Sequence, residues 1–268
     1  MRAALLLITG LAGCDQVWGL ERPDAGPPSD KNDEDLDGIA NSLDPCPHLA
    51  VDDSTDDDQD GIPAICDVDD TKASVAVFFG FDAEGIPAAL EIQGSTASDT
   101  PGTITIGNLG DTLDTITLKN VTAKTSLMDV GFEVIEDTVE ADPASATYNE
   151  LGLHAANTSY APSTRGDTCF FGRLRESESM PLYTELVENE GAHQQKRYSG
   201  ALVGASGRMR LVRTPEMYEC TVVRTGEPTI RDTKDVQFLQ MVPGKLGLST
   251  FKVRVRLRYL YYAYEPLL

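Results

Sequence analysis

Two stretches of the chain superimpose at an offset of 23 residues, and each reads Asp-x-Asp-x-Asp-Gly-Ile with a further Asp at its twelfth position. The first runs from Asp33 to Asp44 and the second from Asp56 to Asp67. A calcium ion takes about 6 to 8 oxygen ligands, and carboxylates at positions 1, 3, 5 and 12 of one loop supply most of them. The sequence therefore predicts two calcium loops.

Each predicted loop also has the two backbone features that such a site needs. Position 6 is Gly38 or Gly61, where the chain must turn sharply, and position 7 offers its carbonyl oxygen as a ligand. The predicted metal ligands are Asp33, Asp35, Asp37, Ile39 and Asp44 in the first loop, and Asp56, Asp58, Asp60, Ile62 and Asp67 in the second.

The charge of this segment supports the same interpretation. Residues 24–70 hold sixteen acidic residues and one basic residue, Lys31, and so carry −15 of the formal net charge of −21. Such a run repels itself, and we expect it to lack the apolar residues of a core, so that its order depends on divalent cations. A solvated acidic linker is the alternative, but the phasing of Asp with Gly favours calcium. We expect no nucleic-acid partner for so acidic a chain.

The amino terminus, residues 1–13, has one Arg followed by an apolar run that is shorter than the roughly 20 residues of a transmembrane helix. It has the features of an export signal. The segment ending at Cys14, Leu-Ala-Gly-Cys, resembles the bacterial lipobox, which implies that Cys14 is lipidated. The resemblance implies a lipid-anchored protein of the bacterial cell envelope, at the outer membrane or cell surface rather than the inner membrane; a soluble secreted protein is the alternative. Residues 14–29 are rich in Pro and Gly and are predicted to form an extended tether.

Four cysteines remain once Cys14 is set aside for lipid, and an even number favours disulfides in an exported protein. Three connectivities are possible. We favour Cys46 with Cys66 and Cys169 with Cys220, and each crosslink would stabilise the fold by about 3 to 4 kcal/mol. A zinc site is the weaker interpretation, because the sequence has no Cys-x-x-Cys pair and its three histidines are scattered.

The acidic segment also resembles a known module. Residues 33–47 resemble the long form of a thrombospondin type 3 repeat, and residues 56–67, which end in Cys-Asp, resemble the short form. The resemblance implies that residues 30–70 wrap calcium ions and that Cys46 pairs with Cys66.

Two positions depart from that pattern. Asn41 stands where the family often has Asp, and Ala64 leaves the ninth position of the second loop without a side-chain oxygen. We therefore expect the second site to recruit water, Asp69 or Asp70, and to bind calcium more weakly than the first.

Residues 71–268 are nearly balanced in charge, with twenty-five acidic and nineteen basic residues, and are long enough for one domain with a core. Short segments rich in β-branched and aromatic residues alternate with Gly, Pro, Asn and Asp, which is typical of strands and turns. The predicted strands are 74–79, 90–93, 103–106, 115–119, 130–135, 168–174, 209–213, 218–223 and 236–241.

The clearest strand is the last one, residues 252–259, in which cationic and apolar residues alternate. We expect Val253, Val255, Leu257 and Tyr259 to face a core and the cations to face water. A strand with one wet face indicates antiparallel sheets, so the predicted fold is all-β, an antiparallel two-sheet sandwich.

The two ends of this region resemble laminin G-like jelly rolls. Residues 77–87, followed by 90–92 and Gly-Ser at 94–95, resemble the opening strands, although Leu90 stands where a Trp is common. Residues 244–250 and the strand after them resemble the closing segment. The resemblance implies a concanavalin A-like jelly roll whose first and last strands pair.

We expect no catalytic residues. Some jelly rolls hydrolyse polysaccharides with Glu-x-Asp-x-x-Glu on one strand, but residues 133–137 lack that Asp, and Glu133 and Glu136 are predicted to point to opposite faces. His154 is expected to pack rather than catalyse. Sugar-binding jelly rolls present aromatic platforms, and the candidate tyrosines are Tyr160, Tyr198, Tyr261, Tyr262 and Tyr264.

The sequence thus predicts a lipid-anchored envelope protein whose calcium-binding stalk presents a jelly-roll domain for binding or adhesion to a glycan or a surface protein. Calcium is expected to act structurally. The alternatives are a polysaccharide-active hydrolase and a purely structural envelope lipoprotein.

Overall fold

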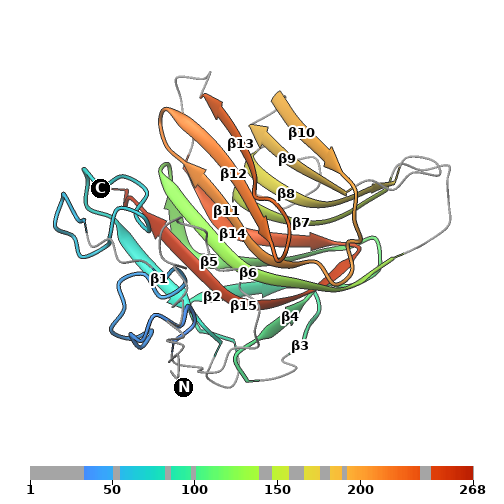
Figure 1. The fold of residues 1–268 in the computed structure, drawn as a ribbon, viewed down its shortest axis with the longest axis horizontal. Helices are drawn as coiled ribbons and strands as arrows, with labels where there is room; N and C mark the ends of the chain where they lie inside the picture. The colour runs from blue at the N-terminus through green and yellow to red at the C-terminus, as the bar shows by residue number, and fades with distance from the viewer. Residues whose placement is uncertain are drawn as a thin grey trace, which may run out of the picture.

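The computed structural model describes residues 33–50, 55–81, 86–97, 101–138, 147–156, 166–175, 182–188, 192–235 and 243–267. All regular secondary structure in these ranges is β, arranged as two antiparallel sheets that face each other (Figure 1). Among the described residues, none forms a helix with the length and hydropathy needed to cross a bilayer.

Eight strands form one sheet in the order β13-β12-β11-β6-β15-β4-β3, and β1 pairs with β15 beside this path. Their bounds are β1 Val75–Phe79, β3 Thr96–Ala97, β4 Ile104–Ile106, β6 Ser126–Asp137, β11 Ser206–Arg213, β12 Met217–Arg224, β13 Ile230–Asp235 and β15 Val253–Tyr264.

Seven strands form the other sheet in the order β10-β9-β8-β7-β14-β5-β2. Their bounds are β2 Leu90–Gln93, β5 Leu113–Ala123, β7 Thr147–Ala156, β8 Gly166–Arg175, β9 Leu182–Glu188, β10 Ala192–Tyr198 and β14 Gly244–Phe251.

The predicted antiparallel two-sheet sandwich is confirmed, and so is the pairing of its first and last strands, since β1 lies antiparallel to β15. The predicted segments from 74–79 to 218–223 each overlap an observed strand, whereas the predicted strand 236–241 lies outside the described residues. The sequence reasoning did not predict β3, β7, β9, β10, β13 or β14 as strands. Several of these strands carry many polar residues; β10, for example, reads Ala-His-Gln-Gln-Lys-Arg-Tyr.

The main core lies between the sheets. Phe132 of β6 meets Phe171 of β8 with ring centroids 5.4 Å apart, and both side chains are fully buried. The predicted disulfide between Cys169 and Cys220 is present, and it joins β8 of one sheet to β12 of the other. This crosslink therefore lies inside the sandwich.

β15 changes its inward-facing positions half-way along its length. Leu257 is opposite Phe132 and Tyr259 is opposite Gly131, so Arg258 is an extra residue. Beyond this bulge the phase of the alternation is reversed, and Tyr259 packs on the outer side of the sheet. The prediction that Tyr259 faces the sandwich core with Val253 and its neighbours is therefore wrong.

The acidic segment packs against this outer face (Figure 1). Ile62, Val68, Cys46 and Cys66 form a second apolar cluster with the sheet. The sheet contributes Leu127, Val212, Tyr259, Tyr261 and Ala263 to the cluster. The expectation that the segment lacks apolar residues able to pack is wrong: they are few, but they gather on one side. We call residues 33–70 the acidic module; its described part lies on the sandwich rather than standing away from it.

Candidate calcium centre

The two predicted calcium loops have the same backbone shape. Gly38 and Gly61 at position 6 have φ of 94° and 92°, and Leu36 and Gln59 at position 4 both have φ of 63°. Residues other than Gly rarely adopt a φ near +90°, so position 6 needs glycine for this turn. The 23-residue sequence repeat is therefore also a repeat of conformation.

Carboxylates fold the first loop by accepting backbone hydrogen bonds. The N–H of Gly38 donates to Oδ2 of Asp33 at 3.0 Å, and that of Ile39 donates to Oδ1 of Asp37 at 2.7 Å. The same two bonds recur in the second loop, from Gly61 to Asp56 at 2.9 Å and from Ile62 to Asp60 at 2.8 Å. Each loop is thus curled around its own acidic side chains.

The carboxylate oxygens of each loop gather at one point. One oxygen from each member of a set lies within 4.8 Å of the others, and the two sets are Asp33, Asp35 and Asp37, and Asp56, Asp58 and Asp60. Oxygens on opposite sides of a calcium ion, each about 2.4 Å from it, are about 4.8 Å apart. The spacing in each loop therefore suits one calcium ion.

Several buried carboxylate oxygens in these loops accept no hydrogen bond within the part of the chain that the structure describes. They are Asp33 Oδ1, Asp35 Oδ2, Asp44 Oδ2, Asp58 Oδ2 and Asp67 Oδ2. A buried carboxylate without a partner is costly, and a bound cation removes that cost. The residues present fit calcium, since the unsatisfied oxygens belong to ligand positions 1, 3 and 12.

The pKa values of the loop carboxylates also show that these side chains are crowded together and partly buried. Burial, together with the charges of Asp37, Asp44 and Asp33, raises the pKa of Asp35 to about 7. Burial also raises the pKa of Asp44 and Asp67. Without a cation, carboxylates brought this close resist ionisation.

The carboxylates expected to complete the second site have other partners. Asp69 Oδ2 lies 2.5 Å from Lys72 Nζ, and Asp70 Oδ1 accepts a hydrogen bond from the N–H of Asp57 at 3.1 Å. Position 9, Ala64, therefore leaves water as the simplest additional ligand.

The sandwich holds the second loop directly. The N–H of Ser74 donates to Oδ2 of Asp60 at 2.6 Å, and the hydroxyl of Tyr261 donates to the carbonyl of Cys66 at 3.0 Å. Ile62 is 7% exposed, whereas Ile39, at the same position of the first loop, is 45% exposed. The second loop is thus ordered by packing as well as by any cation.

A buried polar cluster lies where the acidic module meets the sheet. Asp129 of β6 accepts a hydrogen bond from the hydroxyl of Tyr259 at 3.0 Å and lies 3.6 Å from Nε of Arg208. His48 of the module lies 3.7 Å from the same carboxylate and stacks on Tyr261 with ring centroids 4.2 Å apart. Burial lowers the pKa of His48 well below its usual range and raises that of Asp129.

A different polar group occupies the opposite side of the molecule, on the outer face of the seven-stranded sheet. Leu151 and Leu153 of β7 are in the core, so Tyr148 and Glu150 point to the other face. The hydroxyl of Tyr183 donates to Oε2 of Glu150, and the rings of Tyr148 and Tyr183 meet edge to face at 6.0 Å. Tyr148 is 40% exposed. Burial, with the charge of Glu185, raises the pKa of Glu150 to about 7.

No protein-family model and no curated protein sequence matches the chain. Solved structures do match its fold. Peanut lectin in complex with a nine-residue peptide is 14% identical, with 73% of this chain and 99% of that chain covered and a TM-score of 0.53. The exoplasmic/lumenal domain of VIP36, in its form bound to Ca²⁺ and Man2, is 10% identical, with 69% and 86% covered and a TM-score of 0.50.

The chain has a legume lectin-like fold. At these identities the likeness concerns the fold alone, and it confirms the predicted concanavalin A-like jelly roll.

The tyrosines predicted as sugar platforms are mostly unsuited to that role in this lectin-like sandwich. Tyr261 is buried under the acidic module and Tyr262 is buried in the main core, so neither offers a ring to solvent. Tyr264 is half-buried against the core and Tyr198 belongs to β10. Tyr160 lies outside the described residues, and so does the predicted lipidation site, Cys14. Tyr148 was missed because β7 carries no strong strand signal.

The acidic pair considered for hydrolysis is held in ion pairs. Arg256 donates to Glu133 at 2.7 Å and Arg254 donates to Glu136 at 2.8 Å. The prediction that the two glutamates point to opposite faces is wrong, because a register shift makes Ile135 an extra residue and returns Glu136 to the face of Glu133. Each of these carboxylates thus faces an arginine of β15.

Proposed function

We propose that this protein is a carbohydrate-binding, lectin-like protein of the bacterial cell envelope, anchored by lipid at Cys14, with a calcium-loaded module docked on one face of its sandwich. The fold is the observation that supports glycan binding. Among the solved structures that match the fold, the VIP36 domain is described as bound to Ca²⁺ and Man2.

We assign the glycan to the outer face of the seven-stranded sheet. The acidic module occupies part of the outer face of the eight-stranded sheet, around β6, β11 and β15. The other face offers the half-exposed ring of Tyr148 beside the hydrogen-bonded pair of Glu150 and Tyr183. A ring for stacking next to polar groups that fix orientation is the combination that small-molecule sites use.

A glycan array probed with the purified protein, with calcium and with chelator, tests this function. We expect binding to at least one glycan class, and a loss of affinity of about tenfold in Tyr148→Ala. Val203→Ala is the matched control, because Val203 is also an exposed apolar residue, at 44%, but lies next to β11 in the other sheet. An array without any bound glycan would favour a purely structural role instead.

Calcium acts structurally in this proposal. The acidic module packs on the eight-stranded sheet, whereas Tyr148 belongs to β7 of the seven-stranded sheet. The ions would neutralise the clustered carboxylates and fix the acidic module on its sheet.

The anchor has its own test. Mass spectrometry of the mature amino terminus should show a protein that begins at Cys14 and carries acyl chains. A mature protein with an unmodified Cys14 would leave the glycan-binding proposal in place and would remove the membrane from it.

A further inference from the structure

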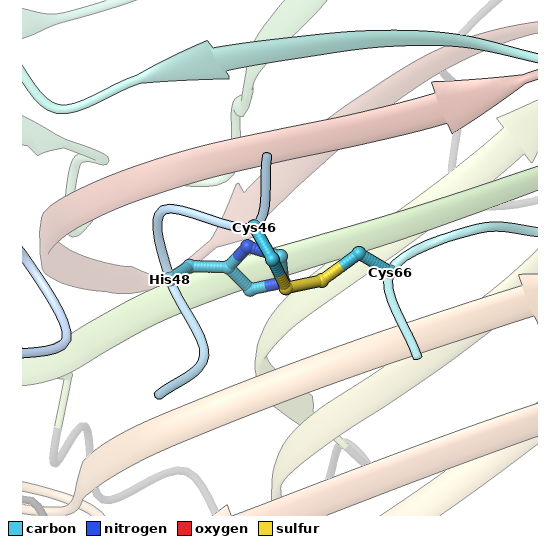
Figure 2. Close-up of side chains that lie close together, drawn as sticks. All are labelled: Cys46, His48 and Cys66. Carbon is cyan, nitrogen blue, oxygen red and sulfur yellow. A yellow bond between two sulfur atoms is a disulfide. The ribbon is translucent and has the colours of Figure 1, made fainter. Parts of the chain in front are cut away.

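A second group of metal-binding side chains lies outside the calcium loops. Cys46, His48 and Cys66 are all buried, and one ligand atom from each lies within 4.8 Å of the others. Figure 2 shows the imidazole of His48 beside the disulfide that joins Cys46 to Cys66. Two sulfurs and an imidazole nitrogen are ligands that zinc prefers and calcium does not.

The imidazole of His48 has no hydrogen bond of its own. Its side chain is 1% exposed, and neither ring nitrogen has a hydrogen-bond partner among the described residues. A neutral imidazole whose nitrogens make no hydrogen bond has a lone pair free for a metal ion.

Asp129 stands behind this ring. Its Oδ2 atom lies 3.7 Å from Nε2 of His48, and its Oδ1 atom is held by the hydroxyl of Tyr259 at 3.0 Å. At 3.7 Å this contact is too long for a hydrogen bond, and neither atom has a hydrogen-bond partner among the described residues. A small movement of the ring would let Nε2 donate to the carboxylate, which would orient the imidazole and leave Nδ1 for a metal. Nδ1 is then the ligand atom, and Asp129 is a positioning residue.

We propose that, when the Cys46–Cys66 disulfide is reduced, the two thiolates and Nδ1 of His48 bind one zinc ion, with water at the fourth position. A phosphine reductant takes the oxygen of one water molecule, and that molecule's two hydrogens complete the two thiols. Zinc binding then releases both thiol protons to solvent.

The backbone already suits this arrangement. The Cα atoms of Cys46 and Cys66 are 5.9 Å apart. Two thiolates bound to a tetrahedral zinc ion at about 2.3 Å are about 3.8 Å apart, so rotation of the side chains makes room for the ion. Zinc would thus replace the disulfide as the crosslink of the acidic module and keep the module on its sheet in a reducing environment. The proposal depends on neither glycan binding nor calcium in the loops.

The test uses the full chain, reduced with a phosphine in saturating calcium and titrated with Co²⁺ and then Zn²⁺. We expect one Co²⁺ per chain, with the thiolate-to-cobalt absorption of a tetrahedral site, and its displacement by Zn²⁺. X-ray absorption of the zinc-loaded protein should show two sulfurs and at least one nitrogen around the metal. The oxidised protein is the control and should give no such absorption.

Variants separate the roles of the residues. Cys46→Ser should abolish the cobalt absorption, His48→Asn should weaken zinc binding at least tenfold, and Asp129→Asn should weaken it about 10- to 100-fold. A reduced wild-type protein without the cobalt absorption would overturn the proposal, and so would a metal shell without nitrogen. Both of these outcomes concern the wild type, so they decide the question even where a variant fails to fold.

Discussion

The hydroxyl of Tyr261 donates a hydrogen bond to the backbone carbonyl of Cys66 across 3.0 Å, and this bond joins the last strand of the sandwich to the second predicted calcium loop. The next residue, Tyr262, points to the main core, where its buried hydroxyl has no hydrogen-bond partner among the described residues. Two adjacent tyrosines thus differ in whether their hydroxyl is satisfied. The bulge at Arg258 decides which of them meets the acidic module.

This difference makes Tyr261→Phe and Tyr262→Phe a matched pair. We expect Tyr261→Phe to lower the free energy of unfolding by about 1 kcal/mol, since it leaves the carbonyl of Cys66 unpaired. Tyr262→Phe removes an unsatisfied hydroxyl and should be neutral or stabilising. Urea unfolding in saturating calcium measures both. Equal destabilisation of the two variants would show that the hydrogen bond to the module contributes nothing.

Calcium removal should destabilise the protein by a predictable amount. A ligand present at about 20 times its dissociation constant stabilises the folded state by about 2 kcal/mol per site, and extracellular sites of this kind bind at about 10⁻⁴ to 10⁻³ M. Asp35→Asn and Asp58→Asn each remove an unsatisfied carboxylate oxygen from one loop, so each should remove one site. Calorimetric titration with millimolar calcium counts the sites.

Asp57→Asn is the control for these variants, because it removes the same charge from an exposed carboxylate at position 2, outside the ligand set. It should leave two sites and nearly the same heat of binding. A wild-type protein that takes up no calcium, and whose melting temperature is unchanged by chelator, would contradict the assignment of both loops.

The turns of the two acidic loops and the sheet class could be predicted from the sequence because each depends on a local pattern. The Asp and Gly phasing specifies a loop conformation within twelve residues, and segments such as Leu90–Gln93 alternate strongly enough to be read as strands. The docking of the acidic module could not be predicted in this way. It joins Cys66 to Tyr261, which are 195 residues apart, and it needs the bulge that turns Tyr259 and Tyr261 outward.

The other features that the sequence reasoning missed also depend on the tertiary structure rather than on a local pattern. A single extra residue in a strand reverses which side chains face the core, and no local signal marked Ile135 or Arg258 as that residue. Tyr148 and Glu150 were missed because β7 contains several polar residues and so was not predicted as a strand. Only the tertiary structure shows that Leu151 and Leu153 fill the core. The position of His48 beside Cys46 and Cys66 is likewise visible only in the folded structure.

A buried ion pair at one end of the main core should be sensitive to the loss of one partner. Nε of Arg213 lies 2.5 Å from Oδ2 of Asp167, and Nη1 of Arg213 donates to the carbonyl of Ala123 at 3.0 Å. Arg213→Met removes the cation beside a buried carboxylate and should lower the free energy of unfolding by about 3 to 5 kcal/mol. In an Asp167→Asn background the same change should cost markedly less. Denaturant unfolding of the four proteins gives the coupling, and additive losses would exclude it.

His154 should give the stability of the sandwich a pH dependence of defined sign. Its ring lies between the hydroxyls of Thr168, at 3.0 Å from Nδ1, and Ser249, and burial lowers its pKa to about 3. Unfolding returns this pKa to about 6.5, so the unfolded state binds a proton that the folded state does not. The stabilisation is fully present above pH 6.5 and is lost as the pH falls towards 3, by up to about 1.4 kcal/mol per pH unit.

His154→Gln should therefore reduce the slope of unfolding free energy against pH by about one proton between pH 4.5 and 6, because glutamine does not titrate. His48, whose pKa is also lowered by burial, contributes a slope of the same sign that remains in this variant. Urea unfolding of both proteins at constant saturating calcium measures the difference and cancels the effect of pH on the calcium loops. Identical slopes would mean that His154 binds its proton equally well in the folded state, and that the hydroxyls of Thr168 and Ser249 accommodate an imidazolium.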